Sequence, residues 1–170
     1  MTEVLAALLG TLVGGFISWI ANSYQNKSQA TFEFHREFDS EVMHKSRILA
    51  DQLVKKNPGF TLYEIYEKYP EESFHIWQVI NFYRRLWTAI KYNQVQAKLI
   101  PDLFGETFIW WYLICFEKQY LPAYDRFGAP KQILKLKKWL DMHSDKSAMN
   151  EWVELALEEC KQRMPEEANK

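Results

Sequence analysis

The sequence is poor in residues that interrupt helices and lacks the spacings that mark catalytic or metal sites. Glycine and proline each occur six times in 170 residues, and no segment alternates apolar and polar residues as a half-buried strand would. The CxxC, HxxxH, GxSxG, Walker A, GxGxxG and HExxH patterns are all missing. We therefore expect an all-α protein that is not an enzyme, with no cofactor and no metal.

Paired cysteines and an excess of charge of one sign are also lacking. Cys115 and Cys160 lie far apart in helix-like segments, which predicts free thiols in a reducing compartment. The net charge is −1, and the residues after Glu3 balance 21 basic against 21 acidic side chains. This balance predicts neither a binder of long nucleic acid nor a basic tail that seeks lipid. His35 and Asp39 lie four residues apart and could orient an imidazole, but a solvated pair on one helix face explains them equally.

A long apolar run stands out at the N-terminus. Val4 to Ala21 contains eighteen residues without a charge, and as a helix it would extend roughly 27 Å, close to the bilayer core of about 30 Å. A cleavable signal peptide would need a basic region before the run, where the only charged side chain is Glu3. We therefore expect residues 4–21 to be a retained transmembrane helix. The basic residues that follow, from Lys27 on, predict that residues 1–3 lie outside and that the body lies in the cytoplasm.

Small residues recur at every fourth position of this apolar segment. They form two adjacent rows, Ala6, Gly10, Gly14 and Ser18 in one and Ala7, Thr11 and Gly15 in the other. In lipid, helices associate through close backbone approach, which small side chains permit. Glycine is also common in membrane helices that stay apart, but two neighbouring rows favour self-association. We expect a homo-oligomer.

Helical periodicity continues to the end of the chain. A stalk over residues 22–31 leads into a cytoplasmic helical domain over 32–165, followed by a tail at 166–170. The stalk helix is expected to run on to about Lys56, with an apolar stripe that includes Phe38 and Val42, and to stop at Asn57-Pro58-Gly59. Further helices are expected at 62–69, 71–93, 131–143 and 147–163, and FIWWYLICF at 108–116 reads as a central core helix because it is apolar on every face. The sequence thus predicts a bundle of about six helices.

One candidate ligand site lies in the helix predicted over 71–93. Trp77, Asn81 and Arg84 share a face, with Arg85 beside them. An indole, an amide and a guanidinium together would suit a nucleotide. Trp77 could equally be part of the core, with Arg84 covering Trp87 by its stem.

Two further basic groups could bind an anion. Lys131, Lys135 and Lys138 share one helix face in a segment without acidic residues, and Arg47 belongs to the cluster His44-Lys45-Ser46-Arg47. The ordinary explanation is that these cations are solvated, or that the lysines pair with the acidic closing helix.

The layout resembles small bacterial single-pass membrane proteins of unknown function. Those proteins have an N-terminal helix, a stalk similar to FEFHREFDSEVMHKSR, an amphipathic helix similar to FYRRLWTAI and an aromatic segment similar to FIWWYLICFEKQYLPAY. The resemblance spans most of the chain, implies a location in the bacterial inner membrane and implies no catalytic residue. The layout is also similar to CRISPR-associated membrane effectors, in which a cytoplasmic helical domain binds cyclic oligoadenylate and the assembled membrane helices compromise the bilayer. This second resemblance implies a role in antiviral defence.

Two main hypotheses follow. The first is an oligomeric sensor-effector whose cytoplasmic domain binds an anionic, nucleotide-type signal and alters the packing of the membrane helices. The second is a membrane-tethered scaffold that recruits a protein partner, for which the aromatic content of 16% would provide contact surface. A membrane-bound enzyme is a third possibility without a supporting motif.

Overall fold

The computed structural model describes residues 2–120 and 131–163, and within them every regular element is helical. The α-helices are α1 (Thr2–Phe38), α2 (Glu41–Lys56), α3 (Leu62–Lys68), α4 (Ser73–Lys91), α5 (Glu106–Trp111), α6 (Lys131–His143) and α7 (Lys146–Arg163). A 3₁₀ turn η1 (Ala97–Leu99) and two π-helical segments, η2 (Pro101–Gly105) and η3 (Tyr112–Tyr120), precede and flank α5. The predicted all-α fold is confirmed. The tail expected at 166–170 lies outside the described residues.

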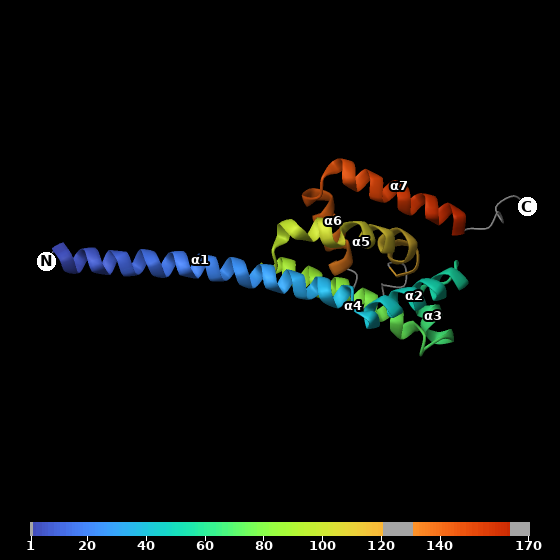
Figure 1. Ribbon diagram of the computed structural model, residues 1–170. Coiled ribbons are helices and arrows are strands. Elements are labelled where there is room, and N and C mark those ends of the chain that lie inside the picture. Colours follow the sequence, from blue (N-terminus) through green and yellow to red (C-terminus); the bar gives the residue numbers. More distant parts are fainter. Residues whose placement is uncertain (1, 121–130, 164–170) are drawn as a thin grey trace, which may run out of the picture.

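Helix α1 is a rod whose N-terminal part extends away from the rest of the molecule (Figure 1). Contact with the other helices begins near Thr31, which is fully buried and whose hydroxyl accepts a hydrogen bond from the Gln96 backbone N–H at 2.7 Å. Among the residues that the structure describes, no helix combines the length and the apolar character needed to cross a membrane. In the span expected over 4–21, the side chains of residues 4–9 lie outside that description.

The expected continuous stalk helix is interrupted, which corrects the prediction. Helix α1 ends at Phe38, and Ser40 caps α2 by accepting a hydrogen bond from the Met43 backbone N–H at 3.2 Å. Serine is a favoured N-cap residue because its hydroxyl satisfies a backbone donor that the first turn leaves free. The interruption changes the phase of the following helix. Val42, expected on the apolar stripe, is therefore 68% exposed, while Met43 faces the core.

Helix α4 also begins later than expected. Its first residue is Ser73, and the acidic residues Glu71 and Glu72 precede its first turn instead of occupying it. The Ser73 hydroxyl donates to the Pro70 carbonyl at 2.9 Å, which ties the helix start to the preceding turn. Its apolar face matches the predicted amphipathic pattern.

The core lies between α4 and the segment that runs from η2 through η3. Helix α4 packs against α2 and α6, and α5 packs against α7. The predicted core helix at 108–116 is confirmed as a buried segment, although it is divided between α5 and η3. Its most buried side chains are at most 1% exposed: Phe108, Ile109, Trp111, Cys115 and Phe116.

Close packing of α7 on this core segment depends on Gly105. A Cβ atom at that position would lie 2.5 Å and 2.6 Å from two carbons of the Trp152 ring. Real Cβ atoms do not approach other atoms so closely, so the missing side chain is what allows the indole to seat there. Gly105 therefore helps to position α5, which supplies half of the groove described next.

Candidate functional site

A groove of about 310 Å³ lies between α2 and α5. Its lining residues are His44, Arg47, Ile48 and Asp51 from α2 and Thr107, Trp110 and Trp111 from α5. The α2 residues follow i, i+3, i+4, i+7 spacing and the α5 residues follow i, i+3, i+4 spacing, so each set forms one face of its helix. The groove is thus the space between two helix faces, and Arg47 is its one residue that the sequence had marked as a ligand candidate.

The π-helical segments on both sides of α5 help to aim its groove residues. A π turn inserts an extra residue and rotates the residues that follow relative to an α-helix, and such turns are frequent at functional sites. In the described chain, η2 ends at Gly105 and η3 begins at Tyr112, directly before and after the six residues of α5. Sequence periodicity does not reveal such rotations, so the sequence did not predict that Thr107 and Trp110 line a groove.

Arg47 is held in an unusual position at the edge of the core. Its guanidinium carbon lies 3.9 Å from the centroid of the Phe38 ring, a cation–π contact. Among residues 2–120 and 131–163, its buried Nε atom has no hydrogen-bond partner, and neither does the buried hydroxyl of Tyr83. Burial holds the pKa of Tyr83 well above its usual range, an effect that the positive charge of Arg47 opposes. Both groups are therefore hydrogen-bond donors at neutral pH, and leaving a buried donor unpaired costs about 1–3 kcal/mol.

Two other polar groups of the groove are already bonded within the protein. Asp51 forms an ion pair with Lys55, with 3.1 Å between Oδ2 and Nζ. The indole N–H of Trp110 donates to Glu159 on α7, which ties this ring to the closing helix. The groove therefore offers one partly exposed guanidinium, one paired carboxylate and the partly exposed indole ring of Trp110. This set suits a small ligand that combines a planar ring with a hydrogen-bond acceptor.

The Cys115 thiol lies in surroundings that disfavour its reactive thiolate form. The thiol is fully buried, and burial raises its pKa to about 12, with the negative charge of Asp51 adding to the effect. Cysteine reacts as the thiolate, which such a pKa makes rare at neutral pH. Cys160 is also buried, and the two cysteines are unpaired.

The group around Trp77 is engaged within the domain. Arg84 donates from Nε to the Gln132 side chain on α6 at 2.8 Å and from its terminal nitrogen to Asn81 at 3.1 Å. Arg85 turns the other way and pairs with Glu37 on α1. Trp77 is partly buried against the core, in agreement with the simpler alternative for this residue. Although the four residues share α4, Arg84 and Arg85 bond to different helices.

The lysines of α6 remain on the surface. Lys131, Lys135 and Lys138 are exposed, and in the described part of the chain none of them forms an ion pair. Their neighbour Lys137 instead pairs with Asp141 of the same helix, at 2.7 Å. The pairing with the acidic closing helix that the sequence left open is thus not seen among these residues, and a solvated face accounts for them.

The cluster at residues 44–47 divides between surface and core. His44 and Lys45 are exposed as a solvated face would be, whereas Ser46 is 2% exposed and bonds to Gln78 and to His75 on α4. Further along the stalk, His35 and Asp39 form the simple pair that their spacing allows, with 3.2 Å between Nδ1 and Oδ2. Across residues 2–120 and 131–163, the structure contains no cluster of three or more potential metal ligands.

The small residues of α1 lie in open surroundings. A Cβ atom added at Gly10, Gly14 or Gly15 would meet nothing within 4 Å, and Thr11 and Ser18 are exposed. The side chain of Ala6 falls outside the described residues. This surface is therefore accessible to another helix.

No family model, curated protein or solved structure matches this chain.

Proposed function

We propose that the chain is a non-enzymatic membrane-anchored sensor-effector. In this proposal α1 inserts into the bacterial inner membrane, its small-residue rows pack against other copies, and the cytoplasmic helical domain binds an anionic, nucleotide-type signal. A cyclic oligoadenylate, and with it a role in antiviral defence, is the first candidate for that signal. Ligand binding that favours one packing of α1 over another would carry the signal to the membrane.

The observation that carries the proposal is the exposed apolar surface of the projecting part of α1. Leu12, Phe16, Ile17 and Trp19 are each at least 60% exposed. A helix that served only in water would carry a polar face, and contiguous apolar surface on this scale marks contact with a membrane or another protein. The exposed Trp19 ring lies near the end of the apolar run and the exposed Tyr24 ring lies just after it, as expected at a membrane–water interface.

The ligand-binding half of the proposal rests on the groove between α2 and α5. Arg47 lines the groove and is partly exposed, and guanidinium groups bind phosphate and carboxylate strongly. The partly exposed indole ring of Trp110 provides apolar surface next to it. A nucleotide contains both a planar ring and an anion, and so fits this combination.

The scaffold remains the second candidate because the domain itself exposes large apolar side chains. Val42, Tyr66 and Phe74 are 68%, 49% and 57% exposed on α2, α3 and α4. Exposed aromatic residues are enriched at protein interfaces. Recruitment of a partner through these residues would need no small ligand.

Membrane insertion and self-association are tested on the full chain in cells. We expect it to remain in the membrane fraction after high-salt and alkaline extraction, and to form cross-linked oligomers there. Gly14→Ile should reduce cross-linking because a large side chain blocks close backbone approach, whereas Val13→Ile, beside the rows, should not. Release of the chain by salt alone would refute membrane insertion, and equal cross-linking of both variants would refute the packing role of the glycines.

Ligand binding is tested by calorimetry of the detergent-solubilised full chain against nucleotides that include cyclic oligoadenylates. Binding by the wild type that is lost in Arg47→Met but kept in Arg36→Met, an exposed α1 position, would place the signal in the groove. If a chain with native helical content binds none of these nucleotides, the sensor-effector proposal fails and the membrane-tethered scaffold becomes the better proposal.

A further inference from the structure

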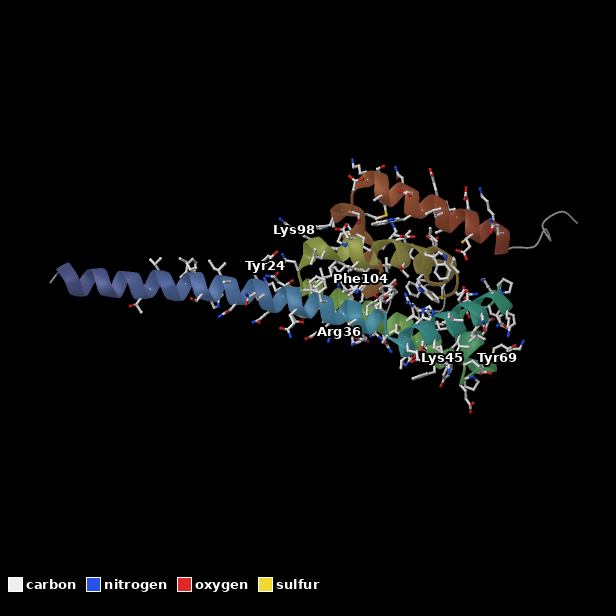
Figure 2. All side chains as sticks on the ribbon, in the orientation of Figure 1. Tyr24, Arg36, Lys45, Tyr69, Lys98 and Phe104 are labelled. Carbon is white, nitrogen blue, oxygen red and sulfur yellow. The ribbon has the colours of Figure 1, made fainter. Side chains whose placement is uncertain are left out.

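One end of the helical domain faces the membrane if α1 spans it. The hydrogen bond between the Gln96 backbone and Thr31 holds the turn after α4 beside α1. Figure 2 shows Lys98 and Tyr24 at the same end of the molecule, the end from which α1 projects. Thr31 lies ten residues after Ala21, the last residue of the charge-free run, and at about 1.5 Å per residue this corresponds to roughly 15 Å.

Cations gather at this end although the chain as a whole is almost neutral. Residues 22–32 and 88–101, which build it, contain Lys27, Lys91 and Lys98 and no acidic residue. Lys91 and Lys98 are exposed and Lys27 is half-exposed. The turn between α6 and α7 lies on the same side in Figure 1 and adds Asp145 and Lys146, one charge of each sign. Exposed Glu33 and Asp102 come directly after these two segments, so the excess of three positive charges is confined to residues 22–32 and 88–101.

Two tyrosine rings accompany these lysines. Tyr24 is 60% exposed on α1, and Tyr92 is 61% exposed at the end of α4. The Lys91 ammonium lies 4.6 Å from the centroid of the Tyr92 ring and 3.2 Å from its hydroxyl, so the two side chains point the same way. Tyrosine prefers the boundary between apolar and aqueous surroundings because its ring is apolar and its hydroxyl is polar.

We propose that this basic end, made of Lys27, Lys91, Lys98, Tyr24 and Tyr92, lies against the anionic lipid headgroups of the membrane that α1 spans. The inference rests on the proposed insertion of α1. It adds that the domain is held on the bilayer surface in one orientation instead of turning freely on a stalk.

Distances and charge support this arrangement. The headgroup layer is about 5–8 Å thick on each side of the core, so the turn at 15 Å stands roughly 7–10 Å above it when α1 is upright. That is about one Debye length at physiological salt, roughly 8 Å. A helix tilt of about 20°, which is usual, and the long lysine stems bring the charges closer. Because anionic lipid attracts each nearby lysine, it is the occupant whose charge complements this surface.

The test measures how close each end of the domain lies to lipid headgroups. The full chain is reconstituted into vesicles of phosphatidylcholine alone or mixed with phosphatidylglycerol, with a fluorophore at Ala97→Cys and a quencher attached to lipid headgroups. Ala97 is exposed at the basic end, and Cys115 and Cys160 are buried, so a thiol reagent labels the introduced site. A fluorophore at Gly59→Cys, where added atoms meet nothing within 4 Å, reports on the turn between α2 and α3.

We expect strong quenching at position 97 in vesicles that contain phosphatidylglycerol, weaker quenching without it, and little at position 59 in either. Each lysine near an anionic surface contributes a factor of about five to the ratio of docked to undocked domain. Lys91→Gln combined with Lys98→Gln should therefore lower that ratio about 25-fold. Lys45→Gln combined with Lys56→Gln, on exposed positions of α2, is the matched control and should leave quenching unchanged.

Equal quenching at position 97 in both kinds of vesicle, or no response to the loss of Lys91 and Lys98, would overturn the inference. In that case an acidic protein surface becomes the better occupant of the basic end. Flotation of the protein with the vesicles is measured on the same samples. A chain that floats without charge-dependent quenching contradicts only this inference, whereas a chain that does not float contradicts the membrane insertion of α1.

Discussion

Replacement of Gly105 by alanine is expected to destabilise the domain even though it favours the helix locally. Gly105 has φ −61° and ψ −55°, so alanine fits the backbone without strain and gains about 1 kcal/mol of helix propensity. The new Cβ would lie 2.5 Å from the Trp152 ring, whereas an ordinary carbon contact is about 3.5–4.0 Å. The indole must therefore move by roughly 1 Å, and overpacking of this kind costs about 1–3 kcal/mol.

The net effect of Gly105→Ala should be a loss of about 1 kcal/mol in the free energy of unfolding. Urea denaturation of the full chain in detergent micelles, followed by circular dichroism, measures it. For a domain of this size we expect a Tm lower by roughly 2–4 °C. The matched control is Gly59→Ala, at an exposed turn position where a Cβ meets nothing within 4 Å, and it should stay within about 0.5 kcal/mol of the wild type.

A double-mutant cycle separates the clash from other effects of the substitution. When Trp152 is replaced by leucine, the ring that meets the new Cβ is gone, and Gly105→Ala should then stabilise the chain through helix propensity alone. The coupling free energy between the two positions should therefore be about 2 kcal/mol, within the range known for residues in contact. Gly105→Ala that stabilises the otherwise wild-type chain, with no coupling to Trp152→Leu, would refute the packing argument.

Three further outcomes follow from local contacts. Ser40→Ala removes the side-chain acceptor for the Met43 N–H and should lower the free energy of unfolding by about 1 kcal/mol in the same assay. Backbone and side-chain hydrogen bonds from Thr61 lower the pKa of Glu64 in the folded state. The stability that Glu64 contributes is therefore present above its unfolded pKa and is lost as the pH falls through its folded pKa. Glu64→Gln should reduce the loss of stability on acidification, and an unchanged dependence of stability on acid pH would contradict this. Cys115 should react with a thiol reagent at pH 7 only after denaturation, because burial raises its pKa to about 12, and rapid labelling of the native chain would disprove that assignment.

Features that depend on local periodicity were predictable from the sequence. The amphipathic pattern of α4 predicted its buried face, and the apolar run at 108–116 predicted the centre of the core. Both predictions held because burial selects the same residue types at helical spacing wherever the helix packs. The charge-free run at 4–21 likewise comes directly from composition, and it continues to support the proposed anchor.

The phase of α2 was predictable in principle but was misread. Ser40 is a favoured N-cap residue, and its place before Glu41 was a signal for a new helix. The stripe through Phe38 and Val42 looked continuous across it, so one long helix was expected. Because α2 begins a new helix at Glu41, a different face of it is buried in the core. The same change of phase turns His44, Arg47, Ile48 and Asp51 toward the groove.

Only the tertiary structure decided which polar groups are available to a ligand. Arg84 and Arg85 bond to Gln132 and Glu37, each about 48 residues away along the chain, and no spacing rule reveals partners at that separation. For the same reason the sequence did not predict the groove, which forms only where two helix faces meet. Nor did it predict the basic end, whose lysines come from two distant segments. Local sequence determined the helices and their apolar faces, because hydrogen bonding and burial within a helix repeat with its turns. Contacts between helices determined the groove between α2 and α5, because they depend on which segments far apart in the sequence pack side by side.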